Sequence, residues 1–189
     1  MSIYLLCGLD LILSGIGFSL SALGDYYYRH YYYKYNIMYT DTIISPLGVL
    51  AIEASDIGLT RVAFIKKRLV TVSANAITDS AKQQLNDYFS GTRQDFNLPL
   101  DPKGTDFQQS VWRYLATIPY GQTASYQDVA NGIDNPKAVR AVGAANGKNP
   151  IAIIVPCHRV IGKNGSLTGY AWGVESKSWL LSHERKEFF

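Results

Sequence analysis

The stretch NPIAIIVPCHRV (residues 149–160) decides how the rest of the chain is interpreted. Its apolar part, Ile151 to Val155, has the length and composition of a buried β-strand. Pro156 follows, and because proline cannot donate to a neighbouring strand we expect the strand to end there. Cys157 comes next, with its side chain free to face a cavity. We therefore predict a strand that ends at a reactive cysteine.

Cys157 needs help to act as a nucleophile. A free cysteine has a pKa near 8.5, so only about 3% of it is thiolate at neutral pH. His158 and Arg159 offer a base and a positive charge. Because adjacent residues rarely point at each other, we expect the proton to reach His158 through a water molecule, with Glu184 orienting the imidazole. For an isolated Pro-Cys-His, a buried and inert cysteine is the alternative interpretation.

Motifs on both sides of the cysteine bear on this choice. Upstream is RAVGAANGKNP (140–150), and downstream are GYAWG (169–173) and WLLSHE (179–184). Together with PCHRV (156–160), they closely resemble the O6-alkylguanine-DNA alkyltransferases, or methylated-DNA-[protein]-cysteine methyltransferases. The resemblance runs from about Ile43 to the C-terminus, with several motifs in the family's order and spacing.

The resemblance implies DNA repair by direct, stoichiometric alkyl transfer from O6-alkylguanine to the cysteine after base flipping, with O4-alkylthymine as a further candidate substrate. The partner would be double-stranded DNA, approached from the minor groove. The implied residues are, for catalysis, Cys157, His158, Glu184, Tyr126 and Asn149; for DNA binding, Arg140, Ala141, Gly143 and Ala144; and for the substrate pocket, Tyr170, Ala171, Trp172 and Val160.

The family implies a specific role for several of these residues. Tyr126 would protonate or hydrogen-bond the leaving guanine, and Arg140 would fill the space that the flipped nucleotide leaves. Asn149 would brace the turn before the cysteine, and the Ala171 amide would recognise O6. Two blander interpretations stay open: a surface tyrosine at position 126, and small residues after Arg140 that merely pack closely on the core.

Two residues of the pocket motif depart from the family. Ala171 and Trp172 stand where other members carry a hydroxyl residue and a glycine. The amide at position 171 survives the change, whereas an indole at 172 puts the size of the pocket in doubt.

Two other classes of function compete with this interpretation. A non-enzymatic damage-recognition protein of the same fold would bind alkylated DNA without reacting, and Cys157 argues against it. A cysteine hydrolase would need an oxyanion hole and a second, hydrolytic step that no motif suggests.

Composition sets the context. The 189 residues are 47% hydrophobic, ample for a core, and include only two cysteines, Cys7 and Cys157, so we expect a reducing cytoplasm and no disulfide framework. No Cys and His cluster has zinc-ligand spacing, and no metal or cofactor is expected. Residues 101–189 hold ten Lys or Arg against seven Asp or Glu, whereas residues 38–100 are balanced. We expect a monomer without a membrane partner.

Residues 1–37 differ from the rest. An apolar run from Ile3 to Leu23, broken by Asp10, precedes a tyrosine-rich segment, Tyr26 to Tyr35. A membrane helix or signal segment is one interpretation, but no Lys or Arg precedes the run and a central Asp costs about 3 kcal/mol on insertion scales. We prefer a translated upstream region, with Met38 as the working start.

Residues 38–100 predict a small packing domain without chemistry of its own. Strands are expected at 41–45, 49–55 and 59–65, joined by turns into an antiparallel meander. Thr78 or Asp79 would cap a helix that runs through Phe89 with Leu85, Tyr88 and Phe89 facing inward. Pro99 to Pro102 would act as the linker.

Residues 101–189 predict a helical, winged-helix-like domain. Capping boxes begin at Thr105, for a helix that ends near Ile118, and at Ser125, for one that ends near Gly132. Asn135 would cap a third helix that reaches Gly147, and the last two would form a helix-turn-helix whose second helix is 137–146. The predicted fold is thus α+β: an N-terminal antiparallel sheet with a helix, then a helix-turn-helix domain that carries the cysteine.

Overall fold

A computed structural model describes residues 38–66 and 73–186, which belong to one compact unit that begins at Met38. The interpretation of residues 1–37 falls outside the described residues. No helix within the described ranges is both long and apolar enough to cross a bilayer.

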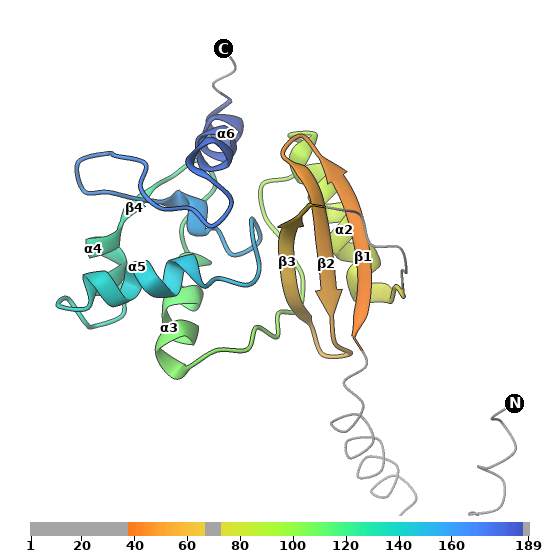
Figure 1. The fold of residues 1–189 in the computed structure, drawn as a ribbon, viewed down its shortest axis with the longest axis horizontal. Coiled ribbons are helices and arrows are strands. Elements are labelled where there is room, and N and C mark those ends of the chain that lie inside the picture. The colour runs from red at the N-terminus through yellow and green to blue at the C-terminus, as the bar shows by residue number, and fades with distance from the viewer. Residues whose placement is uncertain (1–37, 67–72, 187–189) are drawn as a thin grey trace, which may run out of the picture. The chain divides into compact units, whose positions relative to one another are not determined.

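The N-terminal half is a three-stranded antiparallel sheet in the order β1-β2-β3 (Figure 1). Its strands are β1 (Tyr39–Ser45), β2 (Gly48–Ala54) and β3 (Leu59–Ile65). The tight turn between β1 and β2 depends on Gly48, whose φ of 116° is open to glycine and strained for other residues. The predicted meander is confirmed, with boundaries that shift by at most two residues.

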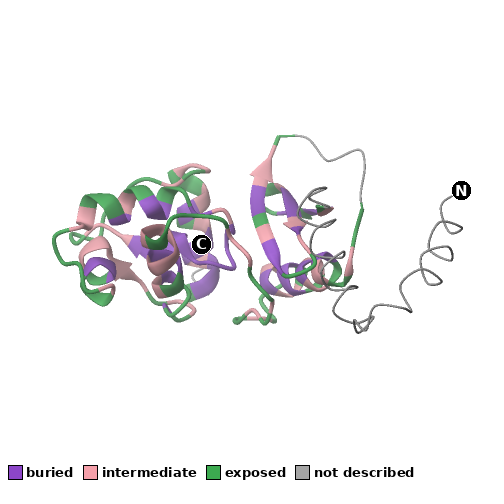
Figure 2. Cartoon of the chain, turned by 90° about the horizontal axis from the view of Figure 1, so that it is seen from below, coloured by how far each residue is buried: buried purple, intermediate pink, exposed green. Residues whose placement is uncertain are grey.

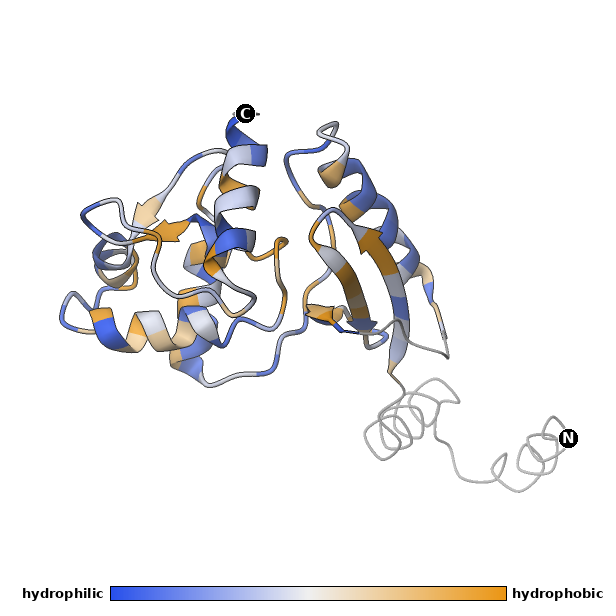
Figure 3. Ribbon diagram, turned by 45° about the horizontal axis from the view of Figure 1, so that its top comes forward, coloured by the Kyte–Doolittle hydropathy of each residue, from blue (hydrophilic) through white to orange (hydrophobic). Residues whose placement is uncertain are grey.

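Helix α2 (Ala76–Phe89) packs on β1 and β2, and its polar face turns outward (Figures 1 and 3). Its cap was predicted wrongly. Asn75 is the N-cap, and Thr78 is the third helical residue, whose side-chain oxygen accepts a hydrogen bond from the Asn75 amide. Both residues belong to one capping box. Thr78, its N3 residue, was predicted as the N-cap, which is Asn75.

The C-terminal half consists mainly of helices. Its elements are α3 (Asp106–Leu115), β4 (Ala124–Ser125), α4 (Tyr126–Gly132), α5 (Val139–Gly147), the 3-10 turn η1 (Cys157–Arg159), β5 (Val160–Ile161) and α6 (Val174–Arg185). The short strands β4 and β5 pair in parallel. Helices α4 and α5 form the helix-turn-helix. The antiparallel sheet of the N-terminal half and the helices of the C-terminal half together confirm the predicted α+β class.

Helix α5 begins later than predicted. Residues 135–138 form a separate turn, closed by a hydrogen bond from the Ala138 amide to the Asn135 carbonyl, and Ala138 caps the helix without a side-chain bond. Proline suits the second position of such a turn as well as it suits the first position of a helix. The Asn-Pro pair therefore starts the turn and not the helix. Helix α3 likewise ends at Leu115, three residues before the predicted Ile118.

The strand predicted at 151–155 does not form. Ile151 makes one parallel bridge to Val62 of β3, and the chain then turns, with a hydrogen bond from the Val155 amide back to the Ile151 carbonyl. Ile153 at the turn has a φ of 71°, an uncommon conformation for a β-branched residue. All five residues are buried (Figure 2). The apolar run therefore indicates burial and not an extended strand.

Candidate active site

Cys157 lies at the start of η1, with its side chain buried between the loop after α5 and helix α6. Burial raises the pKa of the thiol to about 11, although the Asn149 side chain and the Lys177 charge act in the opposite direction. At neutral pH the sulfur therefore carries its proton, and it can become a nucleophile only if a base removes that proton.

His158 is fully buried next to the cysteine, and its Nε2 lies 2.7 Å from Glu184 Oε1. Since a carboxylate oxygen only accepts, the proton of the neutral imidazole sits on Nε2. Burial lowers the pKa of His158, and the nearby cations of Arg159 and Lys177 act in the same direction. Nδ1 has no hydrogen-bond partner among the described residues. It is thus the nitrogen that can accept a proton.

Glu184 on α6 is buried and accepts five hydrogen bonds. Oε1 accepts from Tyr88 Oη at 2.9 Å, His158 Nε2 and Arg159 Nη2 at 3.0 Å, while Oε2 accepts from Arg159 Nε at 2.9 Å and the Gly121 amide at 3.1 Å. Burial alone would raise the pKa of this carboxyl, but His158 and Arg159 outweigh it and hold the pKa at about 2. Glu184 therefore stays ionised and orients His158 without taking its proton.

Asn149 closes the loop that presents the cysteine. Its Nδ2 donates to the Val155 carbonyl at 2.8 Å and to the Ile151 carbonyl at 3.3 Å, and its Oδ1 accepts from the Ile151 amide at 3.0 Å. One side chain thereby satisfies three backbone groups of a buried turn, which would each cost free energy if left unpaired.

Lys177 of α6 is completely buried, which the sequence analysis did not foresee. Its Nζ donates to the Val160 carbonyl at 2.6 Å and the Thr168 carbonyl at 2.9 Å, and lies 6.0 Å from the centre of the Tyr126 ring. A helical pattern could have revealed it. Lys177, Leu180 and Glu184 occupy one face of α6 at spacings of three and four, and that face is buried.

The four predicted pocket residues differ in burial and in the contacts that they make. Tyr170 has a buried hydroxyl with no partner among the described residues; burial raises its pKa, and so do the negative charges of a Cys157 thiolate and of Glu184. Val160 is buried, whereas Ala171 is exposed. The Trp172 ring packs edge-on against Tyr170, with centroids 5.3 Å apart, and against Phe64 of β3 at 5.6 Å. Trp172 thus braces the wall that Tyr170 forms.

Tyr126 begins α4 and donates from its hydroxyl to the Thr168 carbonyl at 3.2 Å. It faces α5, because a Cβ added at Gly143 would lie 3.9 Å from its ring. Arg140, Ala141 and Ala144 are exposed on the same helix, while Gly143 is half-buried. The predicted DNA-binding residues therefore lie on the outer part of α5, next to a tyrosine of the predicted site.

The inner face of α5 explains the remaining small residue. Ala145 is buried, and its carbonyl accepts a hydrogen bond from Trp112 Nε1 of α3 at 2.9 Å. Small size there serves helix packing, as the blander interpretation held.

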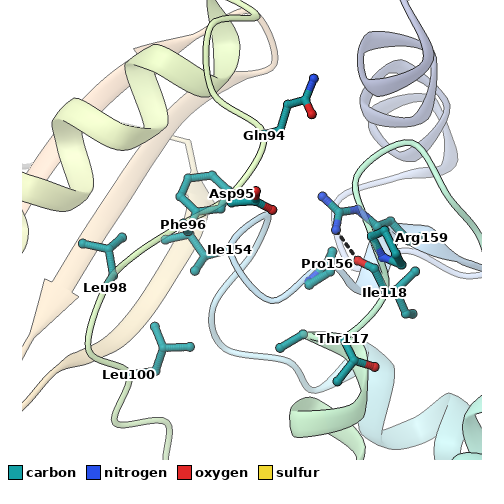
Figure 4. A pocket seen from close by; sticks show the side chains of 12 residues that line it. Gln94, Asp95, Phe96, Leu98, Leu100, Thr117, Ile118, Ile154, Pro156 and Arg159 are labelled. Atoms are coloured by element: carbon teal, nitrogen blue, oxygen red, sulfur yellow. Dashed lines mark hydrogen bonds between the residues drawn. The ribbon is translucent and has the colours of Figure 1, made fainter.

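A cavity of about 250 Å³ opens on the other side of η1 (Figure 4). It is lined by residues from three stretches of the chain: 94–100, 116–119 and 154–159. The Arg159 guanidinium in the last stretch donates to the Ile118 carbonyl. Cys157, Tyr126 and Tyr170 do not line it. This cavity is therefore separate from the predicted alkyl pocket. Within the described ranges, no three His, Cys, Asp or Glu side chains group closely enough to hold a metal ion.

The fold and the site define a class of protein: a helix-turn-helix protein with a buried cysteine, histidine and glutamate behind the second helix. A family model for the DNA-binding domain of 6-O-methylguanine DNA methyltransferase matches residues 106–186, and one for the ribonuclease-like domain of the same proteins matches residues 38–102. The chain belongs to the 6-O-methylguanine DNA methyltransferase family.

Individual relatives agree with this assignment. The chain is 48% identical over 153 residues to a methylated-DNA–protein-cysteine methyltransferase of Methanosarcina barkeri, covering 78% of this chain and 97% of the relative. It is 48% identical over 157 residues to the constitutive enzyme of Bacillus subtilis, covering 78% and 95%.

Solved structures give the same result. The O6-methylguanine methyltransferase of Mycobacterium tuberculosis has a TM-score of 0.73 and 44% identity, over 81% of this chain and 96% of that one. The structure of M. tuberculosis OGT in complex with DNA has a TM-score of 0.70 and 49% identity, over 77% and 91%.

Proposed function

We propose that this protein repairs alkylated DNA by moving the alkyl group from the O6 of guanine onto the Cys157 sulfur. The observation that carries this proposal is the buried Cys157–His158–Glu184 arrangement next to α5, whose Asn146 Nδ2 donates to the Cys157 carbonyl at 3.3 Å and whose outer face carries small residues and one arginine. DNA is the partner that the matched DNA-binding domain calls for. Specifically, we propose that the protein binds double-stranded DNA that contains O6-alkylguanine, that it approaches from the minor groove, and that it acts as a monomer.

The nucleophile would be prepared by His158. Its free Nδ1 accepts the thiol proton through a bridging water, while Glu184 stabilises the imidazolium that results. The thiolate then attacks the alkyl carbon in line with the O6 bond. A sulfur–carbon bond forms, the carbon–oxygen bond breaks, and the electron pair leaves with guanine.

Guanine must gain a proton as it leaves. The Tyr126 hydroxyl is the donor we propose, and exchange with solvent afterwards restores Tyr126 and removes the proton from His158. The Ala171 amide and Tyr170 would hold the base, with Val160 and Trp172 as parts of the pocket wall. No cofactor takes part in these steps. The thioether on Cys157 does not hydrolyse, so each protein molecule acts once.

The target base is not accessible inside a duplex and must be flipped out, which costs a few kcal/mol. Arg140 is exposed at the start of α5 and is the long side chain we propose to enter the space left in the stack. Ala141, Gly143 and Ala144 then allow the helix backbone to approach the groove closely. We place the protein in the cytoplasm, because a reducing compartment keeps Cys157 available as a thiol.

Incubation with duplex DNA that carries O6-[methyl-³H]guanine tests this proposal against its competitors. Alkyl transfer puts the label on the protein, and Cys157→Ala abolishes the labelling. A damage-recognition protein would bind the DNA and leave the label there, whereas a hydrolase would release it as a small molecule. Either of these results would reject the proposal.

A further inference from the structure

Tyr88 connects the N-terminal half to the active site. It lies in the last turn of α2, is fully buried, and donates its hydroxyl to Glu184 Oε1 at 2.9 Å. The sequence pattern predicts that Tyr88 faces inward and indicates only a packing role. Burial raises the pKa of Tyr88 well above its usual value, as does the Glu184 charge, so the phenol remains a donor.

The orientation of the phenol is fixed on several sides. Its ring makes edge-on contacts with Tyr120 and His183 and a tilted contact with Phe96, at centroid distances of 6.2, 5.2 and 5.6 Å. His183 Nε2 also lies 2.8 Å from the Tyr88 carbonyl oxygen. A ring held in this way points its hydroxyl at one place, and that place is Glu184.

Tyr88 shares its acceptor with the proposed base. Glu184 Oε1 accepts from Tyr88, His158 and Arg159 at once, so these donors compete for the negative charge of one oxygen. The more charge Tyr88 draws, the less remains to stabilise a proton on His158. The hydrogen bond from Tyr88 thus reduces the stabilisation that Glu184 gives to protonated His158.

We propose that Tyr88 is a positioning residue that sets the basicity of His158 through Glu184, so that the N-terminal half takes part in the alkyl transfer. This inference rests on the roles proposed above for Cys157, His158 and Glu184. Neutral His158 is the form that accepts the thiol proton. By lowering the affinity of His158 for a proton, Tyr88 would keep more of it neutral at a given pH.

Other charged or titratable groups also act on this cluster, and they stay unchanged in the test. From the elements packed around His158 and Glu184 these are Arg159 and Cys157 of η1, Lys177 and His183 of α6, Tyr120 of the loop after α3, and Tyr170 of the loop before α6.

The test is the pH dependence of alkyl transfer in Tyr88→Phe, which removes one hydroxyl and keeps the ring. Without this donor, Glu184 holds the His158 proton more strongly, and the acid limb of the pH–rate profile should move to higher pH by about half a unit. That shift corresponds to a rate about threefold lower on the acid side. Above the limb the variant should react at least as fast as the unchanged protein.

Tyr114→Phe is the matched control. Tyr114 is a half-buried tyrosine of α3 whose ring lies against Gly132, and the loss of its hydroxyl should leave the limb in place. A uniform loss of rate in Tyr88→Phe at every pH would show a packing role only and overturn the proposal. A shift to lower pH, or no change at all, would overturn it as well.

A second measurement separates this inference from the proposed function. The rate at which iodoacetamide alkylates Cys157, followed by peptide mass spectrometry so that Cys7 is distinguished, reports the same proton transfer without any DNA. The same shift should appear in Tyr88→Phe. If the pH–rate profile for iodoacetamide shifts in Tyr88→Phe while O6-methylguanine DNA does not react with the protein, the proposed function fails and the role of Tyr88 stands. If iodoacetamide shows no shift, the role of Tyr88 fails.

Discussion

Glu184 is the residue on which the proposed chemistry depends, because Tyr88, Gly121, His158 and Arg159 all donate to its carboxylate. Its pKa of about 2 lies below the ordinary value of 4.5. A carboxyl with a depressed pKa stabilises the fold above its unfolded pKa, and this stabilisation is lost as the pH falls through the folded value. Glu184 is thus expected to stabilise the fold in addition to the catalytic role proposed for it.

Glu184→Gln should accordingly lower the free energy of unfolding by about 3 kcal/mol at pH 7, with the difference narrowing as the pH falls from about 4.5 towards 2. Urea unfolding across this range measures it. Glu175→Gln changes an exposed acid on the same helix and should have little effect at any pH. A loss in Glu184→Gln that persists unchanged at pH 2 would show that shape and not charge is responsible.

Trp172 bears on which alkyl groups we expect the protein to accept. Its indole lies between Phe64 and Tyr170, so it supports the pocket wall from behind. Because the indole holds Tyr170 in place, a benzyl group would have to displace packed rings, and overpacking of this kind costs about 1 to 3 kcal/mol, or about 5- to 150-fold in rate. We expect O6-benzylguanine to inactivate the protein poorly, and Trp172→Gly to increase sensitivity markedly with little change in methyl transfer.

Phe64→Leu keeps the indole but weakens its support, and should give intermediate sensitivity. The measurement is the rate of inactivation by O6-benzylguanine for each form. If the unchanged protein is inactivated as readily as Trp172→Gly, the indole does not restrict the pocket.

At this scale the sequence predicted what lies in short motifs and missed what depends on tertiary contacts. Cys157 and His158 are neighbours in one motif, and Glu184 ends another. Tyr88 lies nearly a hundred residues before the carboxylate that it meets, and nothing next to it in the sequence distinguishes it from a core tyrosine. The roles of these residues in alkyl transfer remain predictions until the variants are measured.

Among the helices and strands, α5 is the one whose amino-acid composition fits its proposed role in DNA binding most directly. Its outer face carries Arg140, Ala141 and Ala144, and its inner face packs through Ala145 onto α3. We therefore propose that this helix contacts DNA through its outer side, while its inner side packs on the core.

Arg140→Ala should slow repair of O6-methylguanine in duplex DNA by about tenfold. This corresponds to about 1.4 kcal/mol in activation free energy, a part of the few kcal/mol that base flipping costs. Reaction with free O6-methylguanine should hardly change, because no base needs to be flipped. Lys137→Ala removes an exposed charge from the turn before α5 and should affect duplex repair much less. Equal slowing of the duplex and free-base reactions by Arg140→Ala would reject the role in base flipping.

Element predictions succeeded where a side chain acts locally. The capping boxes at Thr105 and Ser125 are both present, because the reciprocal hydrogen bonds involve residues only three apart. The strand at 151–155 failed because burial on all sides favours apolar residues in any conformation. Asn149, through its three backbone bonds, turns that run into a loop.

Across the whole molecule, the two halves share one site. β3 pairs with Leu100 and Ile151 along its free edge, Phe64 supports Trp172, and Tyr88 reaches Glu184. The sequence analysis expected the N-terminal half only to buttress the other. The family model that matches the N-terminal half covers residues 38–102, and the working start at Met38 remains a prediction.

The central claim is that Cys157 accepts one alkyl group and is then spent. Intact-protein and peptide mass spectrometry after exposure to excess O6-methylguanine DNA tests it most directly. We predict that the mass rises by one methyl group in place of one hydrogen, that the group lies on Cys157, and that transfer stops at one per protein molecule. Cys157→Ala should gain nothing while it still binds the DNA. Repeated turnover by one protein molecule, or a methyl group on any other residue, would contradict the account.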